Sequence, residues 1–197
     1  MEISPTRSAL LEARDERLVM QEGFRFLDEK RLLLAAEMMR VLERYEALDV
    51  LFRQRHAEAV EALKGAVVRH GLGELQSLPV AVLEEMPLQR REKIFFGVYL
   101  AQTEWEEALP KGGVQDSPEA RLCQQAFQSL LIDSVMLATL SGNLHRLLFE
   151  YRRTERRARA LEDVILPELS EMIHEMDQRL EEIDQEESVR VRLRRMA

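Results

Sequence analysis

The sequence predicts an all-α fold: a long antiparallel two-helix coiled coil with a small central insert. Three observations predict it. The composition, 46% hydrophobic and 32% charged with only 6% aromatic residues, is typical of long helices. Four of the six prolines lie between residues 79 and 118, so the strongest helix breakers are concentrated in the middle of the chain. Apolar residues recur at heptad spacing on both sides of this window.

The first segment, residues 1–75, is predicted to contain one helix over about residues 5–70. Ser-Pro at 4–5 is a start signal, an N-cap residue followed by proline at the first helical position. Arg-His-Gly at 69–71 is a stop signal, two cations followed by the residue that tolerates a left-handed conformation. At 1.5 Å per residue this helix is on the order of 100 Å long, so we expect a rod.

Apolar side chains occupy two heptad positions of this helix, three residues apart. One position holds Phe24, Met38, Tyr45 and Phe52, with Arg31 in the remaining slot, and the other holds Leu27, Leu34, Val41 and Leu48. This spacing predicts a coiled-coil seam. Four leucines lie off the seam and are expected to stay partly exposed without a partner: Leu32, Leu33, Leu42 and Leu51.

The second segment, residues 76–116, is the central insert. Its run from Ile94 to Leu100 favours a strand with Gly97 inside it, and residues 80–86 could pair with that run to form a hairpin, accompanied by a short helix. The alternative is a third short helix over 80–93, because short apolar runs suit either structure.

The third segment, residues 117–197, is predicted to be a second long helix starting at Ser-Pro 117–118. Its apolar faces are Leu137, Leu144, Leu148 and Tyr151, then Leu169, Ile173, Met176, Leu180 and Ile183. Two long helices joined through a compact insert must run antiparallel.

Pro167 interrupts this second helix, since it cannot donate a hydrogen bond to the carbonyl of Asp163. The apolar residues Leu161, Ile165, Leu169 and Ile173 nevertheless follow one another in steps of four across it. We therefore predict one helix that passes through Pro167 with a local kink and one lost hydrogen bond. Steps of four also predict a local unwinding of the supercoil.

Composition and motifs exclude several functions. The net charge of -8 argues against a nucleic-acid-binding protein, and the single cysteine excludes an internal disulfide. The chain has no phosphate-binding glycine motif and no apolar run long enough to cross a membrane. We expect a cytoplasmic protein without cofactor or metal.

Two features suggest binding sites but have simpler explanations. Glu171 and His174 form one Glu-x-x-His pattern, whereas a di-iron bundle needs two, so a solvated helix face is expected. The arginines at 152, 153, 156, 157 and 159 alternate with glutamates, which favours a solvated or subunit-contacting surface over nucleic acid or lipid.

Four blocks of the sequence carry distinctive motifs. Residues 4–31 contain Pro-Thr-Arg, then Leu, Gly and Leu-x-x-Lys-Arg, and the others are FFGVYL at 95–100, RRARALEDVILPEL at 156–169 and VRLRRM at 191–196. In this order they resemble the opening, the insert strand, the second block and the basic tail of the D subunit of V-type and archaeal A-type rotary ATPases. The candidate partner-contact residues, from these blocks and the arginine run, are Pro5, Thr6, Arg7, Gly23, Lys30, Arg31, Gly97, Arg152, Arg153, Arg156, Arg157, Leu161, Glu162 and Pro167.

The resemblance implies a non-catalytic central rotor shaft. Its partners would be the catalytic and regulatory A and B subunits, the F subunit of the rotor, and the adaptor (C or d) on the membrane ring. It would couple ATP synthesis or hydrolysis to transport of H⁺ or Na⁺ from the cytoplasmic face of the membrane, without entering the membrane. The alternative is an antiparallel coiled-coil adaptor with no motor, and a third hypothesis is a helical-bundle metalloenzyme.

Overall fold

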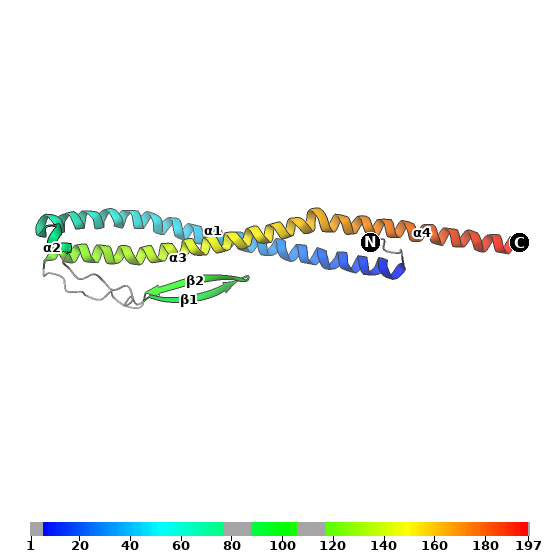
Figure 1. Ribbon diagram of the computed structural model, residues 1–197, viewed down its shortest axis with the longest axis horizontal. Helices are drawn as coiled ribbons and strands as arrows, with labels where there is room; N and C mark the ends of the chain where they lie inside the picture. Colours follow the sequence, from blue (N-terminus) through cyan, green and yellow to red (C-terminus); the bar gives the residue numbers. More distant parts are fainter. Residues whose placement is uncertain (1–5, 77–87, 106–116, 197) are drawn as a thin grey trace. The chain divides into compact units, whose positions relative to one another are not determined.

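The computed structural model describes residues 6–76, 88–105 and 117–196. The chain forms two compact units: unit 1 comprises Met1–Leu33 with Tyr151–Ala197, and unit 2 comprises Leu34–Glu150. Both units contain an antiparallel pair of helix segments, one from each half of the chain (Figure 1). The predicted fold class, a two-helix coiled coil with a small central insert, is confirmed. No described helix is long and apolar enough to span a bilayer.

Helix α1 runs over Arg7–His70 without a break. The observed N-cap is Thr6, whose Oγ1 accepts a hydrogen bond from the Ala9 N–H at 3.2 Å. The predicted Ser-Pro signal at 4–5 lies outside the described residues. The predicted stop is confirmed, because Gly71 has φ +79° and its N–H donates to the Val67 carbonyl at 2.8 Å.

Helix α3 (Pro118–Ala160) begins as predicted. The Ser117 hydroxyl accepts a hydrogen bond from the Ala120 N–H at 3.1 Å, and Pro118 occupies the first helical position. Ser117 Oγ also lies 2.7 Å from Nε2 of His70, so the cap of α3 contacts the end of α1. A five-residue helix, α2 (Leu72–Gln76), follows α1.

Unit 1 is held together by a small apolar cluster at the start of α1. Leu10 and Ala13 pack with Ile173 and Met176 of α4 (Leu166–Met196). Two ion pairs, Arg7–Asp184 at 2.8 Å and Arg14–Asp177 at 2.7 Å, cross between these helices. The residue numbers rise along α1 as they fall along α4, which shows that the helices are antiparallel.

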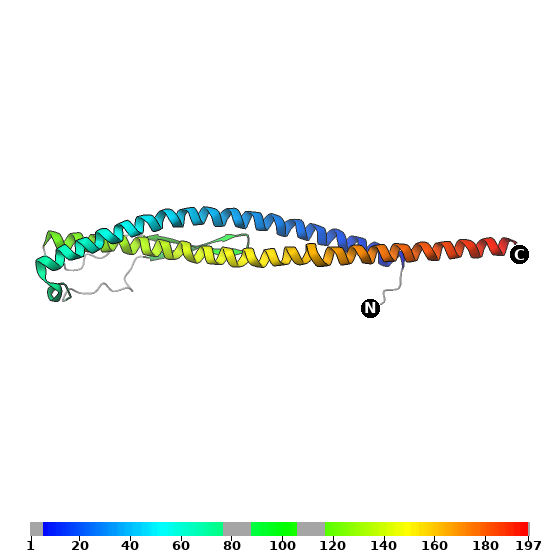
Figure 2. The same ribbon diagram turned by 90° about the horizontal axis from the view of Figure 1, so that it is seen from above.

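Helix α4 continues beyond the start of α1, as Figure 2 shows. Ile183, which we predicted on the apolar face, is 48% exposed. The reason is geometric: α1 begins opposite Asp184, so it supplies few side chains to cover α4 at this level.

In unit 2 the predicted seam is confirmed. Leu34 and Val41 are buried, and the other seam residues of this part of α1 are half-buried: Met38, Tyr45, Leu48 and Phe52. Ala59 and Ala66 are fully buried, so small side chains continue the seam. On α3, the buried Leu130 and Leu147 contribute to the same core. Cys123 is half-buried, and burial raises the pKa of its thiol.

The hairpin consists of β1 (Leu88–Phe95) and β2 (Val98–Trp105), paired antiparallel. The prediction of one strand through Gly97 is wrong, because Phe96 and Gly97 form the turn. Both have positive φ, 45° and 83°, as a two-residue turn between twisted strands requires. The alternative of a helix over 80–93 is also wrong for the strand residues 88–93. The predicted partner strand at 80–86 lies outside the described residues.

The helix passes through Pro167, as predicted, and it contains a π-turn just before the proline, a form of irregularity that the sequence did not predict. This turn, η2 (Leu161–Ile165), joins α3 to α4, and its characteristic bond is Leu166 N–H to the Leu161 carbonyl. Four-residue steps drift about 40° each around a regular α-helix. The wider π-turn takes up part of this drift, so Leu169 and Ile173 remain buried.

Candidate interaction surfaces

The candidate residues at the start of the chain have local structural roles. Thr6 caps α1, and Arg7 Nη2 donates to both carboxylate oxygens of Asp184 at 3.1 and 2.8 Å. Both side chains of this pair are exposed, so its net contribution to stability is small. The pair shows that the start of α1 lies opposite Asp184 of α4. Pro5 lies outside the described residues.

Lys30 and Arg31 are half-buried. Arg31 Nη2 donates to Asp28 Oδ1 at 2.6 Å, an interaction within one helix turn, and Lys30 also has an interaction partner. Because Arg31 occupies a seam position, its half-buried stem substitutes for the apolar side chain of that heptad.

The arginine girdle, residues 152, 153, 156, 157 and 159, is exposed throughout. Thr154 and Ala158, which alternate with it, are 2% and 1% exposed. The girdle therefore lies on the outer surface of α3. Arg159 pairs with Glu155 at 2.8 Å, so part of its charge is balanced locally. Glu171 and His174 are exposed, and in the ranges that the structure describes no group of three acidic, His or Cys side chains could hold a metal.

The second family-like block is centred on η2. Leu161 begins this turn and is half-buried, while Glu162 and Pro167 are exposed. Gly23 of α1 lies opposite, because a Cβ added to it would be 3.9 Å from Leu161 Cδ1. The structure thus places two candidate residues that are far apart in sequence, Gly23 and Leu161, beside each other. Pro167 lies two positions after the end of η2.

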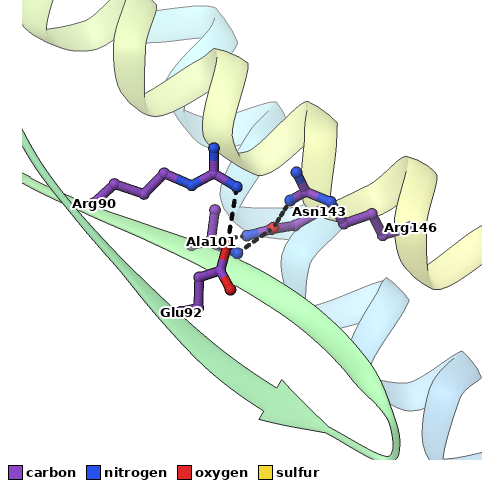
Figure 3. A network of polar contacts seen from close by, with 5 residues as sticks. All are labelled: Arg90, Glu92, Ala101, Asn143 and Arg146. Atoms are coloured by element: carbon purple, nitrogen blue, oxygen red, sulfur yellow. Dashed lines mark hydrogen bonds and ion pairs between the residues drawn. The ribbon is translucent and has the colours of Figure 1, made fainter.

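A side chain that sequence reasoning missed attaches the hairpin to α3. Asn143 is 6% exposed, and its amide binds both backbone groups of Ala101 in β2 (Figure 3). Ala101 N–H donates to Asn143 Oδ1 at 2.8 Å, and Asn143 Nδ2 donates to the Ala101 carbonyl at 2.7 Å. Arg146 adds a donor to the same Oδ1 at 3.1 Å.

The position of Ala101 in the strand explains this contact. Counting from the closing pair Phe95–Val98, Ala101 occupies a position whose backbone N–H and C=O point away from β1. The Asn143 amide therefore pairs with the outer edge of β2 as another strand would. Thr103 and Thr139, whose hydroxyls are 3.0 Å apart, form a second contact between β2 and α3.

The hairpin tip carries an exposed apolar surface, the tip patch, which consists of Ile94, Phe96, Tyr99 and Phe149. These side chains are 62%, 44%, 60% and 66% exposed. Tyr99 and Phe149 also line an open groove of about 440 Å³ between the tip and α3. Phe96 holds a positive φ that disfavours bulky side chains, yet it presents an aromatic ring at the turn. Exposed aromatic residues beside an arginine are typical of protein interaction sites.

The missed residues had a weak signal in the sequence. Asp133 and Asn143 interrupt the apolar run of α3, and polar residues in such a run are candidates for buried hydrogen bonding. Asp133 is 4% exposed and accepts two hydrogen bonds from Arg55 Nη1, at 2.9 and 2.7 Å. Nothing in the local pattern indicated that Arg55 or Ala101 would be the partners.

Comparison with known proteins gives consistent matches over nearly the whole chain. Residues 9–195 match the family model that describes the D subunit of ATP synthase. The chain is 27% identical to the A-type ATP synthase D subunit of Thermococcus sibiricus, covering 98% of this chain and 92% of that protein. It is 25% identical to that of Pyrococcus furiosus over the same shares, and 26% identical to that of Methanoregula boonei over 97% and 94%.

Proposed function

Because this chain belongs to the ATP synthase D-subunit family, we propose that it is the central rotor shaft of a rotary ATPase. In this role it couples ATP synthesis or hydrolysis in the catalytic hexamer of A and B subunits to ion translocation. Its site is the cytoplasmic face of the membrane, and it is itself non-catalytic. The F subunit and the adaptor of the membrane ring are its other partners.

The observation that supports a shaft most directly is helix continuity. Helix α1 extends over 64 residues, and the second helix keeps helical backbone angles on both sides of η2, with φ −62° at Ala160 and φ −66° at Leu166. A rotor must transmit torque, and a hinge of irregular chain between its helices would dissipate it. The ion pairs Arg7–Asp184 in unit 1 and Arg55–Asp133 in unit 2 each join the two antiparallel helix segments of their unit.

We propose that the tip patch binds the F subunit. Its four apolar side chains are exposed in the free chain, and the neighbouring Arg146 supplies a charged rim. The arginine girdle is proposed to face acidic loops of the hexamer. Leu32, Leu33 and Leu51, which are 61%, 43% and 37% exposed, provide further apolar surface for these partners.

Assembly tests the proposal. We expect the chain to form a one-to-one complex with its cognate F subunit, and this complex to insert into the catalytic hexamer, as measured by size-exclusion chromatography and native mass spectrometry. A chain that stays monomeric and captures no component of a rotary ATPase in pull-downs would favour the adaptor alternative.

Phe149→Asp tests the docking surface. We expect it to weaken binding of the F subunit about 30-fold or more, the scale of a lost interface hot spot. Val68→Asp is the matched control, since Val68 is 88% exposed in the same unit but is not part of the tip patch. Isothermal titration calorimetry measures both. Equal affinities for the two variants would place the binding site of the F subunit elsewhere.

Pro167→Ala tests whether the irregular turn matters for rotation. The change supplies the missing N–H and removes the ring that would crowd the Asp163 carbonyl in a regular α-helix, so we expect about 1 kcal/mol of stabilisation and a Tm higher by about 2–4 °C. In the reassembled enzyme we expect less ion pumping per ATP hydrolysed, because the shaft no longer has its native shape in the bearing. Unchanged coupling with a raised Tm would mean that the proline is only tolerated.

A further inference from the structure

The two helices of unit 1 are loosely packed over one stretch. No residue is buried between residues 14 and 33 of α1, nor between residues 159 and 168 of the opposing helix. On either side of the latter range, Ala158 and Leu169 are buried. Loose packing lowers the free energy of local opening, so this stretch opens more easily than the buried positions that flank it.

The π-turn lies within this loose stretch. In η2 the Leu166 N–H donates to the carbonyl five residues back, so the turn is wider than the regular turns beside it. Pro167 lies two positions after the end of η2 and has no backbone N–H to donate. Its ring disfavours regular α-helical geometry at the carbonyl of Asp163, four residues earlier. The proline therefore maintains the π-turn by making the regular turn unfavourable.

The facing helix has its own weak point at this level. Gly23 lies opposite Leu161, and an added Cβ would make only an ordinary contact, at 3.9 Å from Leu161 Cδ1. Close packing therefore does not require a glycine here. A glycine inside a helix costs about 1 kcal/mol relative to alanine, because it leaves the backbone freer to leave helical geometry.

We infer that Gly23, η2 and Pro167 form a torsional joint in unit 1. Both helices yield at the same level, one through the π-turn and the other through the glycine. The segment beyond the joint then twists as one piece about its axis relative to the adjoining end of α3, residues 151–160. The cluster of Leu10, Ala13, Ile173 and Met176 moves with that segment. The joint allows twist without a break in either helix. The inference does not depend on the chain being a rotor.

Hydrogen exchange of the isolated full chain, followed by mass spectrometry, tests the joint. We expect amides of residues 161–170 to exchange about tenfold faster than those of 171–180. Gly23→Ala should slow exchange at 161–170 about fivefold, the equivalent of about 1 kcal/mol. Gly65→Ala is the control: a Cβ there meets nothing within 4 Å, and it should leave exchange at 161–170 unchanged. Equal exchange in the two ranges, or equal effects of the two alanines, would overturn the inference.

A π-turn contains one residue more than a regular α-helical turn. Deleting one residue from η2 tests whether this extra residue makes the joint flexible. Deleting the exposed Val164 together with Pro167→Ala should return the turn to α-helical geometry. We expect a Tm within about 2 °C of the wild type and slow exchange across 161–170. Deleting the exposed Glu171 is the control, because it rotates all later residues by about 100° and removes Ile173 and Met176 from the core. If both deletions lower the Tm equally, η2 is not the flexible element.

Discussion

Arg55→Met is expected to destabilise the protein by about 2–3 kcal/mol, and to lower its Tm by about 4–12 °C. The Asp133 side chain is 6% exposed and its carboxylate is held 2.7 Å from Arg55 Nη1. Removing the arginine leaves a carboxylate buried without its cationic partner. The Arg55 side chain is itself 40% exposed, so we place the effect below that of a fully buried pair. Thermal and urea melts followed by circular dichroism measure the change.

Two further variants isolate the cause. Arg53→Met removes a surface arginine two residues away, whose partner Asp49 lies on the same helix, and it should change stability by less than about 0.5 kcal/mol. The double variant Arg55→Met with Asp133→Leu should regain most of the lost stability, because an apolar pair replaces the buried charge. Similar losses for Arg55→Met and Arg53→Met would mean that Asp133 does not depend on Arg55.

Asn143→Ala is expected to release the hairpin from α3. It removes both hydrogen bonds to Ala101 and leaves the backbone N–H and C=O of a buried residue without partners. Losing these hydrogen bonds lowers the free energy of opening the hairpin by about 2 kcal/mol or more, which raises the population of the open hairpin about 30-fold. Amide exchange across residues 88–105 should therefore accelerate by that factor, and the F subunit should bind more weakly if the tip patch is its site.

Thr139→Val is the matched control for this contact. It removes the hydroxyl that lies 3.0 Å from Thr103 Oγ1 but leaves the Asn143 amide in place. We expect amide exchange across residues 88–105 to accelerate only about fivefold, less than in Asn143→Ala, because a hydrogen bond between hydroxyls contributes about 1 kcal/mol. Asn143→Ala with native exchange in the hairpin would show that other contacts hold β2 on α3.

Local signals in the sequence predicted the helices well. Ser117 and Pro118, and Gly71, mark helix ends by the hydrogen bonding and backbone angles of a few adjacent residues, so no distant residue was needed to interpret them. The heptad series was equally informative, because spacing alone selects the side of a helix that is buried. The family resemblance added the identity of the chain, which periodicity could not provide.

The sequence by itself therefore determined two long helices, their seam and their antiparallel pairing. The tertiary structure decided the rest. Whether Gly97 lies within a strand or at a turn depends on which residues pair with Val98–Trp105. The sequence of one strand does not show which other segment it pairs with. Asn143 and Asp133 acquire their roles from Ala101 and Arg55, which lie 42 and 78 positions away. Likewise, Pro167 indicated an irregularity, but its form as a π-turn depends also on tertiary packing, since the wider turn keeps Leu169 and Ile173 buried in unit 1.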